Sequence, residues 1–184
     1  MMLDTEKFRL LHADVRRRAS KRGLRGVAAW RYFFAEPQYR TLFWCRLAEA
    51  ATCGPVRGCF RRLYLRSSRR TGLEILTPNL GGGVIMPHWG RIILNAASIG
   101  DDLYVFHNVT IGNDYVTGRP SVGSDVFIGT GAALLGDITI GDHVIIAAGS
   151  VVVKDVPPCS LVAGNPARVA KSIASDEIRR MIGY

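Results

Sequence analysis

The feature that most constrains this chain is a six-residue repeat that runs from about Ile93 to Pro157. Aligned in sixes, the segment reads ILNAAS, IGDDLY, VFHNVT, IGNDYV, and after an interruption VGSDVF, IGTGAA, LLGDIT, IGDHVI, IAAGSV, VVKDVP. The first position of each hexad is aliphatic, the second is often glycine, and aspartate often follows. Glycine tolerates the positive φ of a tight corner, and aspartate can bond its own backbone there. Such a chain folds into stacked coils, because one coil alone cannot bury its aliphatic face.

The repeat is irregular in two places. The step from Ile111 to Val122 is 11 residues instead of 12, so Asn113–Ser121 is expected to leave the coil as a loop. Upstream, residues 73–92 read as a weaker version of the same pattern. The repeat therefore predicts a mainly β fold of stacked coils that begins near residue 73.

Charge divides the chain at the same place. Residues 1–72 hold 17 Lys and Arg against 5 Asp and Glu, whereas residues 73–184 hold 7 against 10. Between residues 4 and 70 the apolar side chains follow helical spacings, interrupted by glycine and proline. We therefore expect a small basic helical segment over 1–72, a β-helix domain over 73–171 and a short C-terminal helix over 172–184.

Several classes of protein are disfavoured by composition. The chain has no run of 18 apolar residues that could span a membrane, and its first residues lack the apolar core of a signal peptide, so a cytoplasmic location is expected. The four cysteines form no CxxC pair and no zinc spacing, which favours reduced thiols. The basic run at residues 16–26 has no interleaved aromatic side chain, so no nucleic-acid partner is expected. A solvated helix face, or peripheral contact with an anionic membrane surface or glycan, remains open for this run.

The segments PHWGRIILN, VTIG and KDVPPCSLVAGNPARV resemble the hexapeptide-repeat acyltransferases of the serine acetyltransferase-like group. The similarity covers roughly residues 35–171 and includes the lead-in EPQYRTLFWCRLAE and the junction RRTGLEI. It implies a left-handed parallel β-helix, a homotrimer with active sites between neighbouring subunits, and acetyl-CoA as co-substrate with no metal. In this group a histidine takes the proton of the acceptor hydroxyl while the hydroxyl attacks the thioester carbonyl. An imidazole suits this role because it titrates near neutral pH.

The resemblance assigns two histidines to the catalytic site. His88 matches the family's catalytic base, although Pro87 stands where serine acetyltransferases have an aspartate. His107 follows 19 residues later, close to the 18 residues of one coil, and neighbouring coils stack roughly 4.8 Å apart. The two imidazoles are therefore expected near each other on adjacent coils. O-acetyltransferases of the colanic-acid type resemble this chain in having a histidine at the position of His107, which is expected either to take part in catalysis or to hydrogen-bond within the coil.

The predicted loop also departs from the serine acetyltransferases. Where these carry Arg-His-Pro, this chain has Gly118-Arg119-Pro120, so the histidine is absent. Arg119 is expected to bind an anionic acceptor or a phosphate of CoA, and Asn95 is assigned to the acceptor site.

Four residues are carried over from the family as contacts of acetyl-CoA. Thr130 and Ala148 match positions that hydrogen-bond the pantetheine through the backbone. Lys154 and Arg168 match positions that meet the nucleotide phosphates, where cationic donors are needed. The alternative for Lys154 is a solvated turn residue. His143, in the corner GDHV, is expected to be exposed and inert.

These assignments favour an acetyl-CoA-dependent O-acetyltransferase that acts on a hydroxyl of a sugar or polysaccharide precursor, with His88 as general base. The alternative acceptor is L-serine, against which the missing aspartate and loop histidine argue. Two other classes fit less well. A metal hydratase of the carbonic-anhydrase type needs a third histidine at a suitable spacing, and a scaffold or nucleic-acid binder would rely on the basic segment alone.

Overall fold

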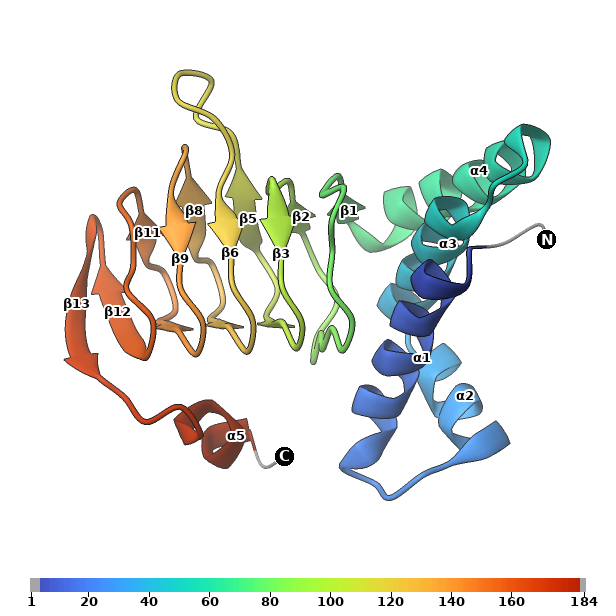
Figure 1. Ribbon diagram of the computed structural model, residues 1–184, viewed down its shortest axis with the longest axis horizontal. Coiled ribbons are helices and arrows are strands. Elements are labelled where there is room, and N and C mark those ends of the chain that lie inside the picture. The colour runs from blue at the N-terminus through green and yellow to red at the C-terminus, as the bar shows by residue number, and fades with distance from the viewer. Residues whose placement is uncertain (1–3, 183–184) are drawn as a thin grey trace.

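The computed structural model describes residues 4–182, and it changes at Gly72 from helices to short strands (Figure 1). The helices are α1 (Thr5–Ser20), α2 (Gly26–Ala35), α3 (Pro37–Ala50) and α4 (Gly54–Thr71), together called the helical arm. Asp4 caps α1 by accepting hydrogen bonds from the backbone N–H groups of Glu6 and Lys7. Gly72 ends α4 in the left-handed conformation, with φ 68°. The expected N-terminal helices are confirmed.

The strands after the arm form three sheets that stack coil upon coil (Figure 1). The first sheet contains β1 (Leu73–Ile75), β2 (Ile92–Leu94), β5 (Val109–Gly112), β8 (Ala133–Leu135) and β11 (Val151–Val152). The second contains β4 (Tyr104–Val105), β7 (Phe127–Ile128), β10 (Ile145–Ile146), β12 (Ser160–Gly164) and β13 (Ala167–Ser172). The third contains β3 (Ser98–Ile99), β6 (Ser121–Val122) and β9 (Thr139–Ile140). Paired strands are parallel except β12 and β13, which confirms the coils that the hexads predict.

The core of the coil consists of the aliphatic residues that begin the hexads, with one correction at Ile93. Ile99 and Ile111 are buried as predicted, but Ile93 is half-exposed between the buried Ile92 and Leu94. Successive side chains of a strand point to opposite faces, so Ile93 must point outward when its neighbours point inward. Leu94, which pairs with Ile111, is therefore the inward residue of this coil.

The glycines at the second hexad position allow neighbouring coils to stack closely, whereas the sequence pattern predicts that they supply the positive φ of the corners. A Cβ on Gly123 would lie 2.9 Å from the backbone N of Asp142, and one on Gly129 would lie 2.6 Å from the backbone N of Ala148. The positive φ falls two residues later instead. Asp102, Asp125 and His143 take φ values of 60°, 54° and 57°, and they follow the stacking glycines of successive coils. The corners thus use aspartate and histidine for the left-handed turn and glycine for coil-to-coil contact.

Two tyrosines of the helical arm close the open edge of the first coil. The Tyr64 hydroxyl accepts a hydrogen bond from the Ile75 N–H at 2.7 Å and donates to the Ile75 carbonyl at 3.1 Å. The Tyr39 hydroxyl likewise accepts a hydrogen bond from the Met86 N–H at 2.9 Å and donates to the Met86 carbonyl at 3.2 Å. Each hydroxyl therefore replaces the neighbouring strand that an edge residue lacks.

A buried ion pair joins the arm to the same coil. Arg46 Nε lies 3.0 Å from Asp14 Oδ2, and both side chains are almost fully buried. The remaining Arg46 nitrogens donate to the carbonyls of Leu80 and Gly81, while Asp14 Oδ1 accepts from the Val84 N–H at 2.9 Å. Hydrogen bonds to the backbone on both sides satisfy the pair, as burial of two charges requires.

The loop and the C-terminus complete the fold. Residues 113–120 protrude from the coil between β5 and β6 (Figure 1), and Ser121, which was expected in the loop, opens β6. The hairpin of β12 and β13, which the sequence did not predict, precedes the short helix α5 (Glu177–Ile182). Ile178 of α5 is buried in a small cluster that includes Ile145.

Candidate active site

Four of the predicted site residues lie in one column along a corner of the coil. The column is set by a ladder of paired residues that runs through Ile85, Tyr104, Phe127 and Ile145. His88, His107, Thr130 and Ala148 each follow one member of this ladder by three positions. Backbone hydrogen bonds join the coils here, since the N–H of Gly131 donates to the His107 carbonyl and that of Gly149 to the Thr130 carbonyl. We call the four residues the corner column.

The two histidines at the head of the corner column lie edge to face. Their ring centroids are 5.9 Å apart and their planes meet at 80°. His88 is exposed, whereas His107 is half-buried, and its Nδ1 is enclosed without a hydrogen-bond partner among the described residues. Gly90 makes room for this pair, because its φ is 151° and a Cβ there would lie 2.9 Å from His107 Cβ. An exposed imidazole in this position can accept a proton from a hydroxyl.

The helical arm fixes the segment that leads to His88. Besides the two hydrogen bonds of Tyr39, the Gln38 side-chain amide donates to the Met86 carbonyl at 3.2 Å. Met86 precedes His88 by two residues, and Phe106 lies beside the His88 ring at 5.9 Å between centroids. The sequence did not reveal Tyr39 and Gln38 as supports of this site, because no local pattern links a helix to an irregular segment 47 residues away.

The two residues assigned to the acceptor contact each other but not the histidines. Arg119 Nη1 lies 3.4 Å from Asn95 Oδ1. Both residues lie at the corner that follows β2 and β5, whereas His88 and His107 precede these strands. Within one chain the two groups therefore lie at opposite ends of the strands of the first sheet.

The loop before Arg119 is organised by Asp114. Its carboxylate accepts hydrogen bonds from the backbone N–H groups of Val116, Thr117 and Gly118 and from the Thr117 hydroxyl. These bonds, with that of the Thr117 amide first, hold the pKa of Asp114 below its ordinary value. Tyr115 and Val116 at the tip are almost fully exposed. The loop thus has a fixed backbone and presents an apolar tip.

The cations assigned to the CoA phosphates lie together at the last coils. Lys154 and Arg168 line the same hollow of about 120 Å³, and both are exposed. Lys154 follows β11, whereas Ala148 of the corner column precedes it. The structure therefore brings the two cations to each other, at the far end of the strand from the column.

His143 is not the exposed, inert residue that the sequence predicts. Its Nδ1 lies 3.1 Å from Oδ2 of the buried Asp125, and Arg179 Nε of α5 approaches the same oxygen at 3.6 Å. His143 and Asp125 occupy equivalent corners, so stacking places their side chains together. The matching corners GSDV and GDHV carried this signal in the sequence.

The described residues offer no clustered metal ligands. Across residues 4–182 no three His, Cys, Asp or Glu side chains gather closely enough to hold an ion. The four cysteines in this range are free thiols.

Comparisons with known proteins place the chain among acyltransferases. Residues 119–154 match the family described as Bacterial transferase hexapeptide (six repeats). A serine acetyltransferase of Helicobacter pylori is 34% identical over 155 residues, which make up 80% of this chain and 87% of that protein. The first two curated relatives match over only 24% and 41% of their own lengths, so the chain spans less than half of each.

Solved structures show the same relationship. Soybean serine acetyltransferase complexed with serine superposes with a TM-score of 0.74 at 29% identity, over 91% of this chain and 70% of that one. Serine acetyltransferase from Brucella abortus strain S19 in complex with coenzyme A gives a TM-score of 0.74 at 27% identity, over 92% of this chain and 70% of that one.

Proposed function

The chain belongs to the serine acetyltransferase family, and on this premise we propose that it transfers an acetyl group from acetyl-CoA to the hydroxyl of L-serine. The sequence alone favours a sugar hydroxyl, and membership of this family reverses that order. One solved relative holds serine and another holds coenzyme A. The observation that carries the proposal is the pair of histidines at the head of the corner column.

In the proposed reaction His88 is the general base. Its imidazole takes the proton of the serine hydroxyl while the hydroxyl oxygen bonds to the thioester carbonyl carbon. The tetrahedral oxyanion then collapses, the carbon–sulfur bond breaks, and the imidazolium returns the proton to the leaving thiolate of CoA. General base catalysis of this kind contributes roughly 10²–10⁴-fold to the rate.

We assign His107 to the support of His88 or to the binding of the acceptor. Pro87 supplies no carboxylate to orient the base, and His107 is the adjacent imidazole. The enclosed Nδ1 of His107 has no partner among the described residues, so a rotated His88 would find an unpaired hydrogen-bonding group there.

Acetyl-CoA, as the acyl donor, is proposed to lie along the rest of the corner column. Gly131 and Gly149 are exposed there, and a Cβ on Gly149 would meet nothing within 4 Å. The edge beside Thr130 and Ala148 is therefore bare of side chains, as a long flexible pantetheine arm requires. Lys154 and Arg168 are proposed to meet the phosphates.

We also propose a homotrimer of left-handed β-helices with active sites between subunits. In one chain, Asn95 and Arg119 lie where the strands of the first sheet end, whereas His88 lies where they begin. If both groups act on one acceptor, a neighbouring copy must supply one of them. Light scattering that finds a monomer under assay conditions would contradict this part of the proposal.

A sugar hydroxyl is the second candidate acceptor. It is favoured by Pro87 and Arg119, which stand where the family resemblance predicts an aspartate and a histidine for serine. Acetyl-CoA would be used in the same way, so the two candidates differ in acceptor alone.

A thiol-release assay separates the candidates. Wild-type protein is incubated with acetyl-CoA and either L-serine or a panel of nucleotide- and lipid-linked sugars. We expect CoA release that depends on L-serine. Release with a sugar and not with serine supports the second candidate, and no release with any acceptor contradicts both.

A further inference from the structure

A groove between α3 and α4 gathers three arginines without a carboxylate. It encloses about 300 Å³ and is lined by Arg40, Arg66 and Arg70, with Trp44 and Leu63 as its apolar part. The three arginines are exposed, and none of them has a hydrogen bond or ion pair within residues 4–182. The groove therefore concentrates positive charge that the described part of the chain leaves unpaired.

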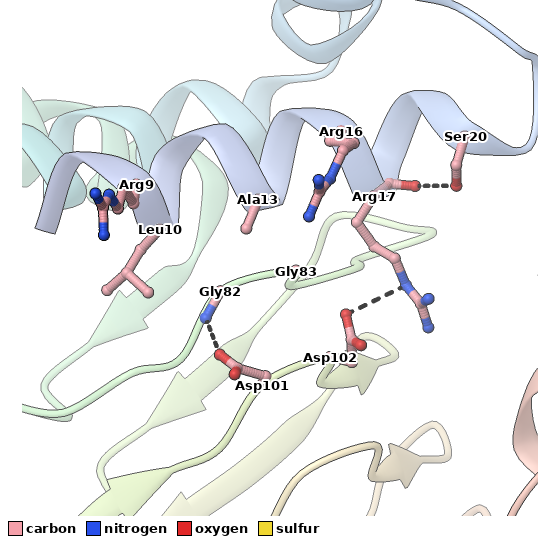
Figure 2. Close-up of a pocket in the computed structure, with 10 residues that line it drawn as sticks. All are labelled: Arg9, Leu10, Ala13, Arg16, Arg17, Ser20, Gly82, Gly83, Asp101 and Asp102. Atoms are coloured by element: carbon pink, nitrogen blue, oxygen red, sulfur yellow. Dashed lines mark hydrogen bonds and ion pairs between the residues drawn. The ribbon is translucent and has the colours of Figure 1, made fainter. Parts of the chain in front are cut away.

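A larger hollow beneath α1 differs from the α3–α4 groove, because acidic side chains line it together with arginines. It encloses about 610 Å³, and Arg9, Arg16 and Arg17 face Asp101 and Asp102 across it (Figure 2). Arg17 Nε lies 3.5 Å from Asp102 Oδ1. Carboxylates of the coil thus offset much of the positive charge in this hollow, which the α3–α4 groove does not show.

The basic run at residues 16–26 is also partly engaged inside the molecule. The Arg18 guanidinium lies 4.7 Å and 4.8 Å from the ring centroids of Tyr32 and Tyr39, and Arg22 lies 4.9 Å from that of Tyr32. Cation–π contacts of this kind hold α1 against α2 and α3. The basic run at residues 16–26 is therefore less available to an outside partner than the α3–α4 groove, although it is the more conspicuous feature of the sequence.

The exposed side of α4 is basic throughout. The helix contains six arginines and no acidic residue: Arg57, Arg61, Arg62, Arg66, Arg69 and Arg70. Between them, Leu63 and Leu65 are 36% and 41% exposed. These arginines give the exposed side of α4 a positive charge that attracts an anionic surface, and each cation close to such a surface contributes about 1 kcal/mol.

We propose that the α3–α4 groove binds the phosphate headgroup of an anionic phospholipid, with α4 lying on the bilayer surface. The planar guanidinium group matches phosphate through two parallel hydrogen bonds, and three of these groups line the groove. Leu63, which lines the groove, would contact the acyl boundary. The contact is peripheral, since no helix in residues 4–182 is long and apolar enough to cross a bilayer. A nucleic acid fits less well, because Trp44 already stacks on Phe60.

Vesicle sedimentation tests the proposal. Binding is measured to phosphatidylcholine vesicles with and without phosphatidylglycerol, for wild type and for the triple variant R40Q/R66Q/R70Q. An arginine near an anionic surface contributes about fivefold to binding, and these three also contact the headgroup, so the triple variant should bind more than about 100-fold more weakly.

The matched control is R61Q/R62Q/R69Q, which removes the same charge from the exposed side of α4 outside the groove. It should lose less than the groove variant, because its arginines contribute the long-range attraction, up to about fivefold each, but make no headgroup contact. Equal losses in both variants, binding that does not depend on phosphatidylglycerol, or tighter binding to an RNA oligonucleotide would each overturn the proposal.

Two further measurements keep these outcomes interpretable. CoA release in the absence of vesicles should be unchanged in both triple variants, which separates this proposal from the proposed reaction and shows that the variants fold. In the variant W30F/W89F, brominated phosphatidylglycerol should quench the fluorescence of Trp44, and unquenched fluorescence in vesicle-bound protein would place the headgroup elsewhere.

Discussion

The coil and the helical arm are stabilised in opposite ways. In the coil, each short strand bonds to the next coil, and aliphatic residues such as Ile111 and Ile128 stack on their own repeats. In the arm, single side chains act over long sequence distances, as Tyr39 does on Met86 and Arg46 on Leu80. A repeat supplies a scaffold with an open edge at its first coil, and a non-repeating segment is needed to close that edge.

The two regions also differ in charge and in chemistry. The arm carries the strong positive charge of the chain, whereas the corner column with its histidines lies on the coil. We therefore assign the reaction to the coil, and support and surface contact to the arm.

The largest effect is expected from His88→Ala. Loss of the base should lower kcat roughly 10²–10⁴-fold without loss of fold, because His88 is exposed and makes no hydrogen bond among the described residues. CoA release is the readout. His12→Ala removes an exposed imidazole of the arm and serves as the control, which should keep full activity. Wild-type turnover in His88→Ala would refute the proposed mechanism.

Asp14→Ala should be the most destabilising change at the junction of the two regions. It leaves the buried Arg46 guanidinium with only the longer contact to Glu49, at 3.8 Å, and removal of one partner of a buried pair costs about 3–5 kcal/mol in the free energy of unfolding. Urea unfolding measures this quantity. Glu177→Ala breaks the exposed pair with Lys171 and should change stability little. Similar losses in both variants would show that the buried pair does not secure the arm.

Tyr39→Phe and Tyr64→Phe form a matched pair. Each variant removes one hydroxyl that bonds both backbone groups of a first-coil residue, so each should lose about 1–3 kcal/mol of stability. Only Tyr39 leads to His88, so only Tyr39→Phe should also lower kcat, by about tenfold, with an unchanged KM for acetyl-CoA. An equal kcat in the two variants would limit Tyr39 to a structural role.

Ala148→Tyr should have the smallest effect. A ring on the bare edge of the corner column obstructs the donor, so the KM for acetyl-CoA should rise about tenfold with little change in kcat. Thr139→Tyr places the same ring at an exposed position of the third sheet and should change neither constant. An unchanged KM in Ala148→Tyr would remove the column from the CoA site.

The coil was predictable from the sequence because its signal is local and repeated. Aliphatic residues every six positions define the inward face, and the 19-residue spacing of His88 and His107 placed them on adjacent coils. The predicted hexad register was wrong at Ile93, because this coil is one residue shorter and Leu94 is the residue that points inward. One hexad cannot reveal such a shift, because neighbouring aliphatic residues fit the pattern equally well.

The contacts of the arm were not predictable in this way. The partners of Tyr39 and Arg46 lie more than 30 residues away, and they depend on how the helices dock on the coil. The role of His143 was misjudged for a related reason, since its contact with Asp125 follows from the stacking of two equivalent corners, which the approach of Arg179 to the same carboxylate completes. Such contacts arise from tertiary packing and leave no periodic trace in the sequence.

The central claim is that acetyl-CoA meets the coil and not the arm, and hydrogen exchange with and without CoA tests it most directly. Ligand binding stabilises the backbone that it contacts, so exchange should slow in peptides that cover Gly129–Gly131 and residues 147–149. Peptides from residues 5–71 should exchange at unchanged rates. Slowed exchange confined to the helical arm would contradict the assignment of the reaction to the coil.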